Sequence, residues 1–403
     1  MGSTALSDIE TRLFINNEFV PAKSGKTFQL INPATEEPSY AKGAWEEWFA
    51  KDGMKISLEK ATKNDTNDVH KTLQLATDPQ LSLSLTSLVL LAMSMSKDHL
   101  NFTLKQPYGD VAAIIPWNVP ILMALNKIAP AVAVDEILRK APLTSILLAQ
   151  LIKETGLFPP GVVQILSGAR ESGEALASHM EIRKIAFTGM HIEAWRVAFN
   201  SGQTCTSAAR LYVQESVLEP FLAVFRPTFE GFLTNHGDPL DRKVTHGPQA
   251  DKLQYESVLK FIEAGKNSTA QMLTGGKRKG DKGYFIEPTI FLNPPDDNDV
   301  VTKETFGPVI TFFTFKTEEE AITRANATEY ALFSSVFIRD IFRALRIAKK
   351  YESGTVTINC TSHYQAVDMA FGGVKGSGDG REYGRWGLDS WLEIKSVLID
   401  LTE

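Results

Sequence analysis

Apolar residues recur along this chain with two different periods, and together they predict a mixed α/β protein. Helical spacing, which gathers apolar side chains on one face, is found over 142–156, 216–233, 250–265, 317–326 and 340–351. Short runs rich in β-branched and aromatic residues, typical of strands, lie over 161–166, 184–187, 208–214, 309–315, 331–337 and 354–359. Strands that alternate with helices in this way indicate βαβ units and a parallel sheet.

The N-terminal half carries weaker patterns. Residues 13–31 predict short strands with a turn at Ser24-Gly25-Lys26, and residues 101–115 predict a strand pair around Pro107 to Asp110. Residues 119–134 predict a largely buried helix that is polar chiefly at Asn126 and Lys127, and residues 171–179 predict another helix. Between 39 and 99 the pattern is irregular and predicts no particular element.

Composition narrows the class of protein. A chain of 403 residues suggests two or three domains of ~100–200 residues each. A net charge of −6, without a basic cluster, argues against a nucleic-acid partner. The run from Leu81 to Met95 contains serines and is too short to span a bilayer, so we expect no membrane partner. Two cysteines give no disulfide framework, and no signal pattern begins the chain, so a cytoplasmic protein is the default expectation.

One cysteine lies in a setting suited to chemistry. The segment Ser201-Gly202-Gln203-Thr204-Cys205-Thr206 places it in a small, polar, glycine-containing turn. A nucleophilic thiol must ionise from a pKa of about 8.5, which requires a polar and partly accessible pocket. A lone cysteine is more often a small buried hydrophobe, so the turn alone does not decide between the two interpretations. The seven histidines show no metal-ligand spacing, and we expect no metal site.

Three further motifs occur in a fixed order around this cysteine. They are Ile115-Pro116-Trp117-Asn118-Val119-Pro120, Lys303-Glu304-Thr305-Phe306-Gly307-Pro308-Val309, and Phe371-Gly372-Gly373-Val374-Lys375. Together with Cys205 they resemble the signatures of the NAD(P)-dependent aldehyde dehydrogenase superfamily. The N-terminal segments 14–20 and 32–35 are also similar to that family, and the resemblance covers about 12–38, 100–134, 141–189 and 201–403.

The resemblance implies a fold and a domain division. The fold is α/β, with two three-layer α/β domains and a small β extension for oligomerisation. A Rossmann-like cofactor domain, here incomplete, would comprise 1–100 and 113–199, and the catalytic domain would comprise 200–382. Residues 101–112 and 383–403 would form the oligomerisation strands of a homodimer or homotetramer.

The resemblance also implies roles for individual residues. Cys205 would attack an aldehyde carbon, the side-chain amide of Asn118 would stabilise the oxyanion, and Glu382 would order water near the thioester. NAD or NADP would be the cofactor, with binding residues Glu304, Phe306, Gly189, Trp117 and Gln254. The substrate pocket would include Phe371, Thr204 and Thr206. Outside this frame, Asn118 is a turn residue before Pro120, and Glu304 and Glu382 are surface charges.

The chain departs from the family pattern in two places. Only sixteen positions separate Gly189 from Cys205, where the family has several dozen, including the Glu-Leu-Gly-Gly motif that supplies the general base. Glu193 is the only carboxylate near that gap. Between Val134 and Pro142 the family's buried strand and its Lys-Pro-Ser/Ala-Glu ending are missing, so Lys140 is not expected to hold the adenosine ribose.

These departures leave alternatives open. The first interpretation is an enzyme that oxidises an aldehyde to a carboxylate with NAD(P)⁺ through a cysteine thioester. The second is a catalytically impaired or inactive relative that serves as a binding or oligomer-forming subunit. The third is a cofactor-independent thiol esterase that uses Cys205 and Asn118 alone.

Overall fold

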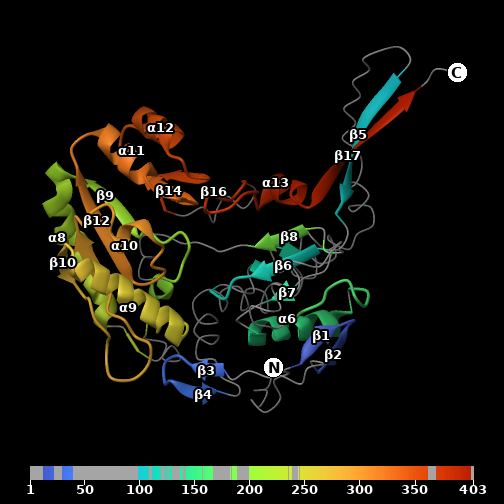
Figure 1. Ribbon diagram of the computed structural model, residues 1–403, viewed down its shortest axis with the longest axis horizontal. Helices are drawn as coiled ribbons and strands as arrows, with labels where there is room; N and C mark the ends of the chain where they lie inside the picture. Colours follow the sequence, from blue (N-terminus) through green and yellow to red (C-terminus); the bar gives the residue numbers. More distant parts are fainter. Residues whose placement is uncertain are drawn as a thin grey trace.

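The computed structural model contains two α/β halves and a projecting two-stranded ribbon (Figure 1). It describes residues 12–21, 30–39, 99–108, 111–118, 123–124, 127–128, 137–138, 142–156, 158–166, 182, 184–187, 199–234, 236–237, 244, 246–361 and 369–400. The predicted turn at Ser24 to Lys26 and the predicted helix at 171–179 lie outside these residues.

The N-terminal half is built on a short parallel sheet. Strand β6 (Val111–Ile115) lies between β7 (Ile137–Leu138) and β8 (Lys184–Phe187). Helix α6 (Pro142–Thr155) ends before Gly156, whose φ of 60° is a conformation that glycine adopts without strain. The sequence predicts no strand between Val134 and Pro142, and this is wrong, because β7 extends the edge of the sheet by two residues.

Apolar side chains from distant segments form the core of this half. Phe14, Ala113, Ile115, Leu148 and Ile165 belong to one buried cluster. Phe14 comes from β1 (Leu13–Ile15), which pairs with β2 (Glu18–Val20), and β3 (Leu30–Asn32) pairs with β4 (Glu37–Ser39).

In this half one turn was not predicted, and one strand prediction needs correction. The tight turn after β1 is at Asn16-Asn17, where both residues have positive φ, as hairpin turns of two residues require. Residues 161–166 do not form the predicted buried strand. Ile165 makes only an isolated bridge to Phe14, since the chain bends at this point and no second strand continues the pairing.

The C-terminal half contains a four-stranded sheet in the order β10-β11-β12-β9. These strands are Gln271–Thr274, Thr289–Leu292, Val309–Phe315 and Arg210–Gln214, respectively. Alternate residues of β12 point to opposite faces: Val309 and Phe313 pack with one cluster, and Ile310 and Phe312 with another.

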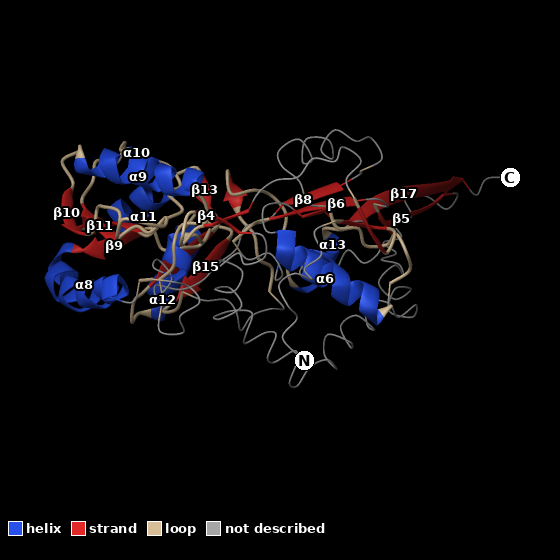
Figure 2. Ribbon diagram, turned by 90° about the horizontal axis from the view of Figure 1, so that it is seen from below, coloured by secondary structure: helices blue, strands red, loops and turns tan. Residues whose placement is uncertain are grey.

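One helix covers each face of this sheet. Helix α9 (Lys252–Lys266) supplies Val258 and Ile262 to the first cluster, and α8 (Leu218–Thr234) supplies Phe229 to the second. Figure 2 shows the two helices above and below the strands, as a three-layer arrangement requires. Short segments η4 (Phe199–Gly202), η5 (Glu215–Val217) and α10 (Asp299–Thr302) connect these elements.

The remaining elements follow the sheet. Helices α11 (Glu318–Asn326) and α12 (Ile341–Lys350) accompany the parallel pair β14 (Phe333–Val336) and β15 (Thr355–Ile358). The pair β13 (Tyr330–Ala331) and β16 (Val374–Lys375) is antiparallel, and α13 (Gly384–Asp389) comes next. The helices and strands predicted between 208 and 359 are therefore confirmed, with ends that differ by a few residues.

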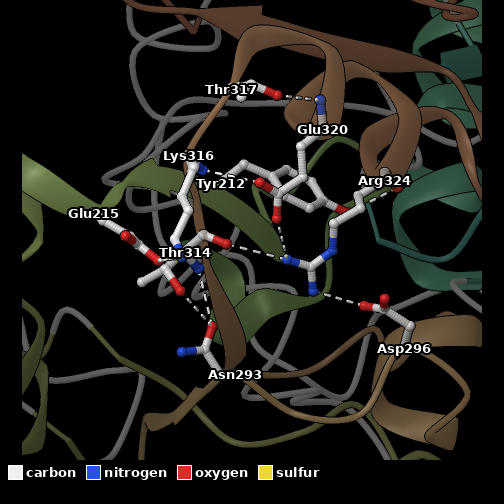
Figure 3. A network of polar contacts seen from close by, with 9 residues as sticks. All are labelled: Tyr212, Glu215, Asn293, Asp296, Thr314, Lys316, Thr317, Glu320 and Arg324. Atoms are coloured by element: carbon white, nitrogen blue, oxygen red, sulfur yellow. Dashed lines mark hydrogen bonds and ion pairs between the residues drawn. The ribbon is translucent and has the colours of Figure 1, made fainter.

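Arg324 holds α11 to the four-stranded sheet (Figure 3). Its guanidinium donates to the Thr314 carbonyl at 3.1 Å and to the Asp296 carboxylate at 2.7 Å. The guanidinium lies 4.7 Å from the ring centre of Phe313. The backbone carbonyl of Arg324 accepts a hydrogen bond from the Tyr212 hydroxyl at 3.1 Å. Because these partners lie on three different segments, the network fixes the position of the helix relative to the sheet.

The projecting ribbon, which we call the arm, consists of β5 (His99–Pro107) and β17 (Leu392–Asp400). The two strands are antiparallel over their whole length and extend beyond the rest of the protein in both views (Figures 1 and 2). The prediction that residues 101–115 form a strand pair is wrong, because β5 pairs with β17 and β6 pairs with β7 and β8.

Candidate active site

Cys205 lies at the end of a strained turn, residues 199–206, which we call the Cys205 turn. Asn200, Ser201 and Gly202 have φ angles of 50°, 55° and 74°, and residues other than glycine rarely adopt such angles. The segment 247–250 holds the turn in place through four hydrogen bonds. They are Ser201 Oγ to Gly247 O (2.5 Å), Gln249 Nε2 to Ser201 O (3.1 Å), Gln203 Nε2 to Pro248 O (3.3 Å) and Ala250 N to Gln203 Oε1 (2.7 Å).

A second turn, residues 303–308, which we call the Glu304 turn, packs directly on the first. A Cβ atom at Gly202 would lie 1.9 Å from the Gly307 carbonyl oxygen and 2.6 Å from the Pro308 nitrogen. Only glycine permits this approach of two backbones. Gln254 fixes the Glu304 turn from α9, because its Nε2 donates to the Phe306 carbonyl at 2.8 Å.

Asn118 follows β6 and reaches the Cys205 turn from the other half of the protein. Its side chain is 2% exposed, and Nδ2 donates to the Gln203 carbonyl at 3.1 Å. A side-chain amide carries two N–H donors, and this contact uses one of them. The structure therefore brings the Asn118 side chain to the Cys205 turn, at a residue two positions before the cysteine.

A cleft of about 1780 Å³ contains this arrangement. The residues predicted to have functional roles that line it are Cys205, Asn118, Glu382, Glu304, Phe306, Trp117, Gln254, Phe371, Thr204 and Thr206. The remaining predicted residue, Gly189, and the carboxylate Glu193 lie outside the described residues. Lys127 and Lys184 also line the cleft, although the sequence assigns them no role.

The Cys205 thiol is not ionised by its surroundings at neutral pH. It is partly exposed to the cleft, yet protein surrounds the sulfur, and this burial raises its pKa well above the usual range. The Glu304 carboxylate contributes the next largest increase, and Glu382 a smaller one. The backbone N–H groups of Cys205 and Thr206 lower the pKa in part. The thiol therefore needs a base if it is to act as a nucleophile.

The Glu304 turn presents a carboxylate and an aromatic ring to the cleft. Glu304 is an exposed residue, yet the neighbouring protein partly desolvates its carboxylate and raises its pKa. The rings of Trp117 and Phe306 meet edge to face at 5.6 Å, with an angle of 74° between their planes. Phe306 has a φ of 50°, and Gln254 stabilises this conformation through the carbonyl contact.

An ion pair also lines the cleft. Lys127 is 2% exposed, and its ammonium contacts Glu382 Oε1 at 2.5 Å. Glu382 is placed by Phe371, because the two backbones exchange hydrogen bonds of 2.8 and 2.6 Å. Sequence reasoning missed Lys127 as a site residue. The available signal was a charged residue inside a segment predicted to be buried, since a buried charge requires a partner.

Lys184 lies beside this ion pair. Its ammonium is 5.5 Å from the ring centre of Tyr108 and 5.0 Å from that of Trp391. Burial, and secondarily the charge of Lys127, lower its pKa. The contacts join β8 to the residue that follows β5 and to the residue that precedes β17. Among the described residues, no group of three or more potential metal ligands occurs, and no helix has the length and apolar character needed to cross a membrane.

The sequence model of the aldehyde dehydrogenase family matches residues 56–192 and 190–397. The two matches meet between Gly189 and Cys205, where the sequence lacks the general-base segment. An aldehyde dehydrogenase of Enchytraeus buchholzi is 34% identical over 486 positions, which cover 96% of this chain and 95% of the relative. One of Davidiella tassiana is 34% identical over 480 positions, covering 97% and 95%. These alignments are longer than the 403 residues of the chain, so the relatives contain internal segments that this chain lacks.

Solved structures give the same result. An NAD⁺ complex of aldehyde dehydrogenase from Bacillus cereus has a TM-score of 0.80 and 29% identity, with 98% of each chain covered. Betaine aldehyde dehydrogenase from Staphylococcus aureus in complex with NAD⁺ has a TM-score of 0.81 and 25% identity, with 99% of this chain and 96% of that chain covered. With a matching family model, full-length relatives and a shared fold, the chain belongs to the aldehyde dehydrogenase family.

Proposed function

We propose that this protein oxidises an aldehyde to a carboxylate with NAD or NADP, and that Cys205 is the nucleophile. The observation that supports this most directly is the Asn118 contact, which brings an amide donor from one half of the protein to the cysteine turn of the other. The sulfur would attack the carbonyl carbon of the aldehyde. A C–S bond forms, and the carbonyl oxygen becomes an oxyanion.

Stabilisation of that oxyanion falls to donors near the sulfur. The backbone N–H groups of Cys205 and Thr206 already interact with the thiol. The second N–H of Asn118 makes no hydrogen bond to another described residue, and it would donate to the oxyanion. Removal of one such donor typically lowers the rate ~10²–10³-fold.

The described part of the cofactor site fits a nicotinamide and its ribose. Glu304 makes no side-chain hydrogen bond or ion pair with another described residue, and its carboxylate can accept from the two ribose hydroxyls. Phe306, in edge contact with Trp117 and held by Gln254, provides an aromatic wall for the ring. Bound NAD or NADP would supply the hydride acceptor. Gly189, the residue predicted to approach the diphosphate, lies outside the described residues.

The last step, hydrolysis of the thioester, requires a water molecule. Glu382, oriented by Lys127 and by the backbone of Phe371, would order the water that attacks the thioester carbon. Hydrolysis breaks the C–S bond, releases the carboxylic acid and returns the proton to sulfur or solvent. Thr204 and Thr206, which are 5% and 7% exposed, would form part of the substrate pocket with Phe371.

The arm supports an oligomer. Ile394 and Leu398 of β17 are 69% and 73% exposed, and among the described residues neither long edge of the ribbon pairs with a further strand. We propose that the arm joins a second copy in a homodimer or homotetramer of a cytoplasmic enzyme, with 101–112 and 383–403 as the oligomerisation strands. A sedimentation measurement that gives a monomer at micromolar concentration would contradict this part.

Aldehyde-dependent formation of NADH or NADPH by the purified protein is the test of the activity. We expect reduced cofactor to accumulate with the wild-type protein, and Cys205→Ala to abolish its formation. Cys360→Ser is the matched control, because Cys360 is exposed and does not line the cleft. A folded wild-type protein that forms no reduced cofactor with a panel of aliphatic and aromatic aldehydes would refute the proposal.

A further inference from the structure

The thiol of Cys205 needs a proton acceptor, and the cleft offers few. The carboxylates that line it, among the residues that the structure describes, are Glu304, Glu318, Asp379 and Glu382. No histidine is among the described residues that line the cleft. Among the described residues that line the cleft, these four carboxylates are therefore the candidates for the base that we consider.

Three of the four carboxylates already accept hydrogen bonds or form ion pairs with other groups of the protein. Glu318 contacts Arg343 at 2.6 Å and Arg346 at 3.0 Å, and the two guanidinium groups lower its pKa to about 2. A carboxylate with so low a pKa is a weak base. Asp379 is exposed and accepts from the Gly380 N–H at 2.8 Å. Glu382 is held by the Lys127 ammonium, and its charge affects the sulfur less than that of Glu304 does.

Glu304 differs from the other three. Its carboxylate has no ion-pair partner among the described residues, and desolvation raises its pKa, which makes it a stronger base than an unperturbed carboxylate. It is also the charged group whose field raises the pKa of Cys205 most. Two carboxylates on one cleft thus have contrasting surroundings: Glu382 is paired with the Lys127 ammonium, and Glu304 has no such pairing among the described residues.

Packing between the two turns fixes the positions of Glu304 and Cys205 relative to each other. Gly202 packs against Gly307, so each reactive side chain lies three residues from the point where the two turns touch. Gln254 holds the Glu304 turn, and the segment 247–250 holds the Cys205 turn. The two turns therefore form one rigid unit on the four-stranded sheet.

We propose that Glu304 is the proton acceptor for the Cys205 thiol, in place of the general-base segment that this chain lacks. This inference rests on the proposed role of Cys205 as the nucleophile. The thiol proton moves to a Glu304 carboxylate oxygen as the sulfur forms its bond to the carbonyl carbon. With an activated ester, the alcohol leaves with that proton, water then attacks the thioester carbon, and its proton passes through Glu304 to the departing thiolate. The net reaction is ester plus water to acid plus alcohol, and it needs no cofactor.

Two rates measured without cofactor test the proposal, both in a Cys360→Ser background so that Cys205 is the only thiol. The first is acylation by p-nitrophenyl acetate, followed as the burst of nitrophenol. The second is alkylation by iodoacetamide, which requires only the thiolate. We expect Glu304→Gln to lower the acylation rate ~10²–10⁴-fold near neutral pH. The same substitution removes a negative charge beside the sulfur, so alkylation should become faster.

Opposite changes in the two rates distinguish a base from a structural residue, because a disturbed turn would lower both. The pH profile adds a third measurement: in the wild-type protein the acylation rate should rise over the titration of Glu304, and in Glu304→Gln only at the higher pH where the thiol ionises. Asp379→Asn is the control and should change neither rate. Equal acylation by Glu304→Gln and Asp379→Asn, or a wild-type protein that is alkylated but not acylated, would overturn the proposal. The NADH assay with Cys205→Ala tests the proposed function separately.

Discussion

The contact between Gly202 and Gly307 allows a sharp test of how the two turns form one site. Substitution of Gly202 by alanine changes the stability in two ways. An alanine with φ near 74° costs about 1–2 kcal/mol, of which about 0.4–1 kcal/mol is recovered because the unfolded chain becomes less flexible. The new Cβ would also lie 1.9 Å from the Gly307 carbonyl oxygen, and such overpacking typically costs about 1–3 kcal/mol.

Gly280→Ala provides the matched control. Gly280 has a φ of 69°, close to that of Gly202, and a Cβ there would have no heavy atom within 4 Å. The two variants share the conformational cost and differ only in the clash, so we expect Gly202→Ala to be less stable by about 1–3 kcal/mol. For a folding unit of this size, this lowers the melting temperature by roughly 2–12 °C relative to Gly280→Ala.

Thermal unfolding followed by calorimetry measures the difference. A decrease for Gly202→Ala that exceeds that for Gly280→Ala, together with altered alkylation of Cys205, would confirm that the two backbones touch. Equal melting temperatures for the two variants would refute the reasoning, because then the Cys205 turn and the Glu304 turn are not in contact.

Three further predictions concern other parts of the protein. Lys127→Met removes the ammonium that contacts Glu382. Removing one partner of a buried pair costs about 3–5 kcal/mol of stability, and because Glu382 is 22% exposed we expect a smaller loss. In a double-mutant cycle, adding Glu382→Gln should restore part of this stability, whereas additive losses would contradict the pairing. Burial and the neighbouring His246, whose ring lies 4.0 Å away, lower the pKa of His236 below its usual 6.5, so the unfolded chain binds more protons than the folded protein. The stability contributed by His236 should be full above about pH 6.5 and fall below it by at most about 1.4 kcal/mol per pH unit. Melting temperatures of His236→Gln that depend on pH as steeply as those of the wild type would contradict this. Arg324→Lys keeps the charge but loses the planar group that contacts Thr314, Asp296 and the Phe313 ring, and we expect urea unfolding to show a loss of about 1–2 kcal/mol, with no loss refuting the role of the network.

Much of the C-terminal half was predictable because local pattern and tertiary burial agree there. The predicted strand at 309–315 is β12 itself, and its alternate side chains enter two cores as its period requires. The short strands β10 and β11 were missed. In β10 the first two of four residues are exposed, and β11 is a brief apolar run, so neither shows an alternation that is distinctive in the sequence.

Strand partners were harder to predict than strands. Residues 99–107 and 111–115 are adjacent in sequence, and a hairpin is the simplest expectation for them. The structure instead pairs the first with residues almost three hundred positions away, since the period of a strand identifies its faces and not its neighbour. In the structure β7 and β8 occupy the two edges of β6, so neither edge is left for β5.

The candidate site was predictable only through motifs. Asn118, Cys205, Glu304 and Glu382 are distant in sequence, and no local pattern brings them together. Their common cleft follows from the family resemblance, and the structure places all four around it. Lys127 and the Gly202 contact were not predicted, because both depend on the exact orientation of segments that the sequence leaves undetermined.

The contacts that anchor the Cys205 turn have a consequence for the nascent chain during synthesis. Among the described residues of the C-terminal half, the contacts that anchor the turn from outside it, from Gly247 to Pro308, come from residues that follow Cys205 in the chain. A nascent chain on the ribosome therefore exposes its cysteine before the walls around it exist. During synthesis the thiol lacks the enclosure that suppresses its ionisation in the finished protein, so oxidants and alkylating agents encounter it in its least protected form.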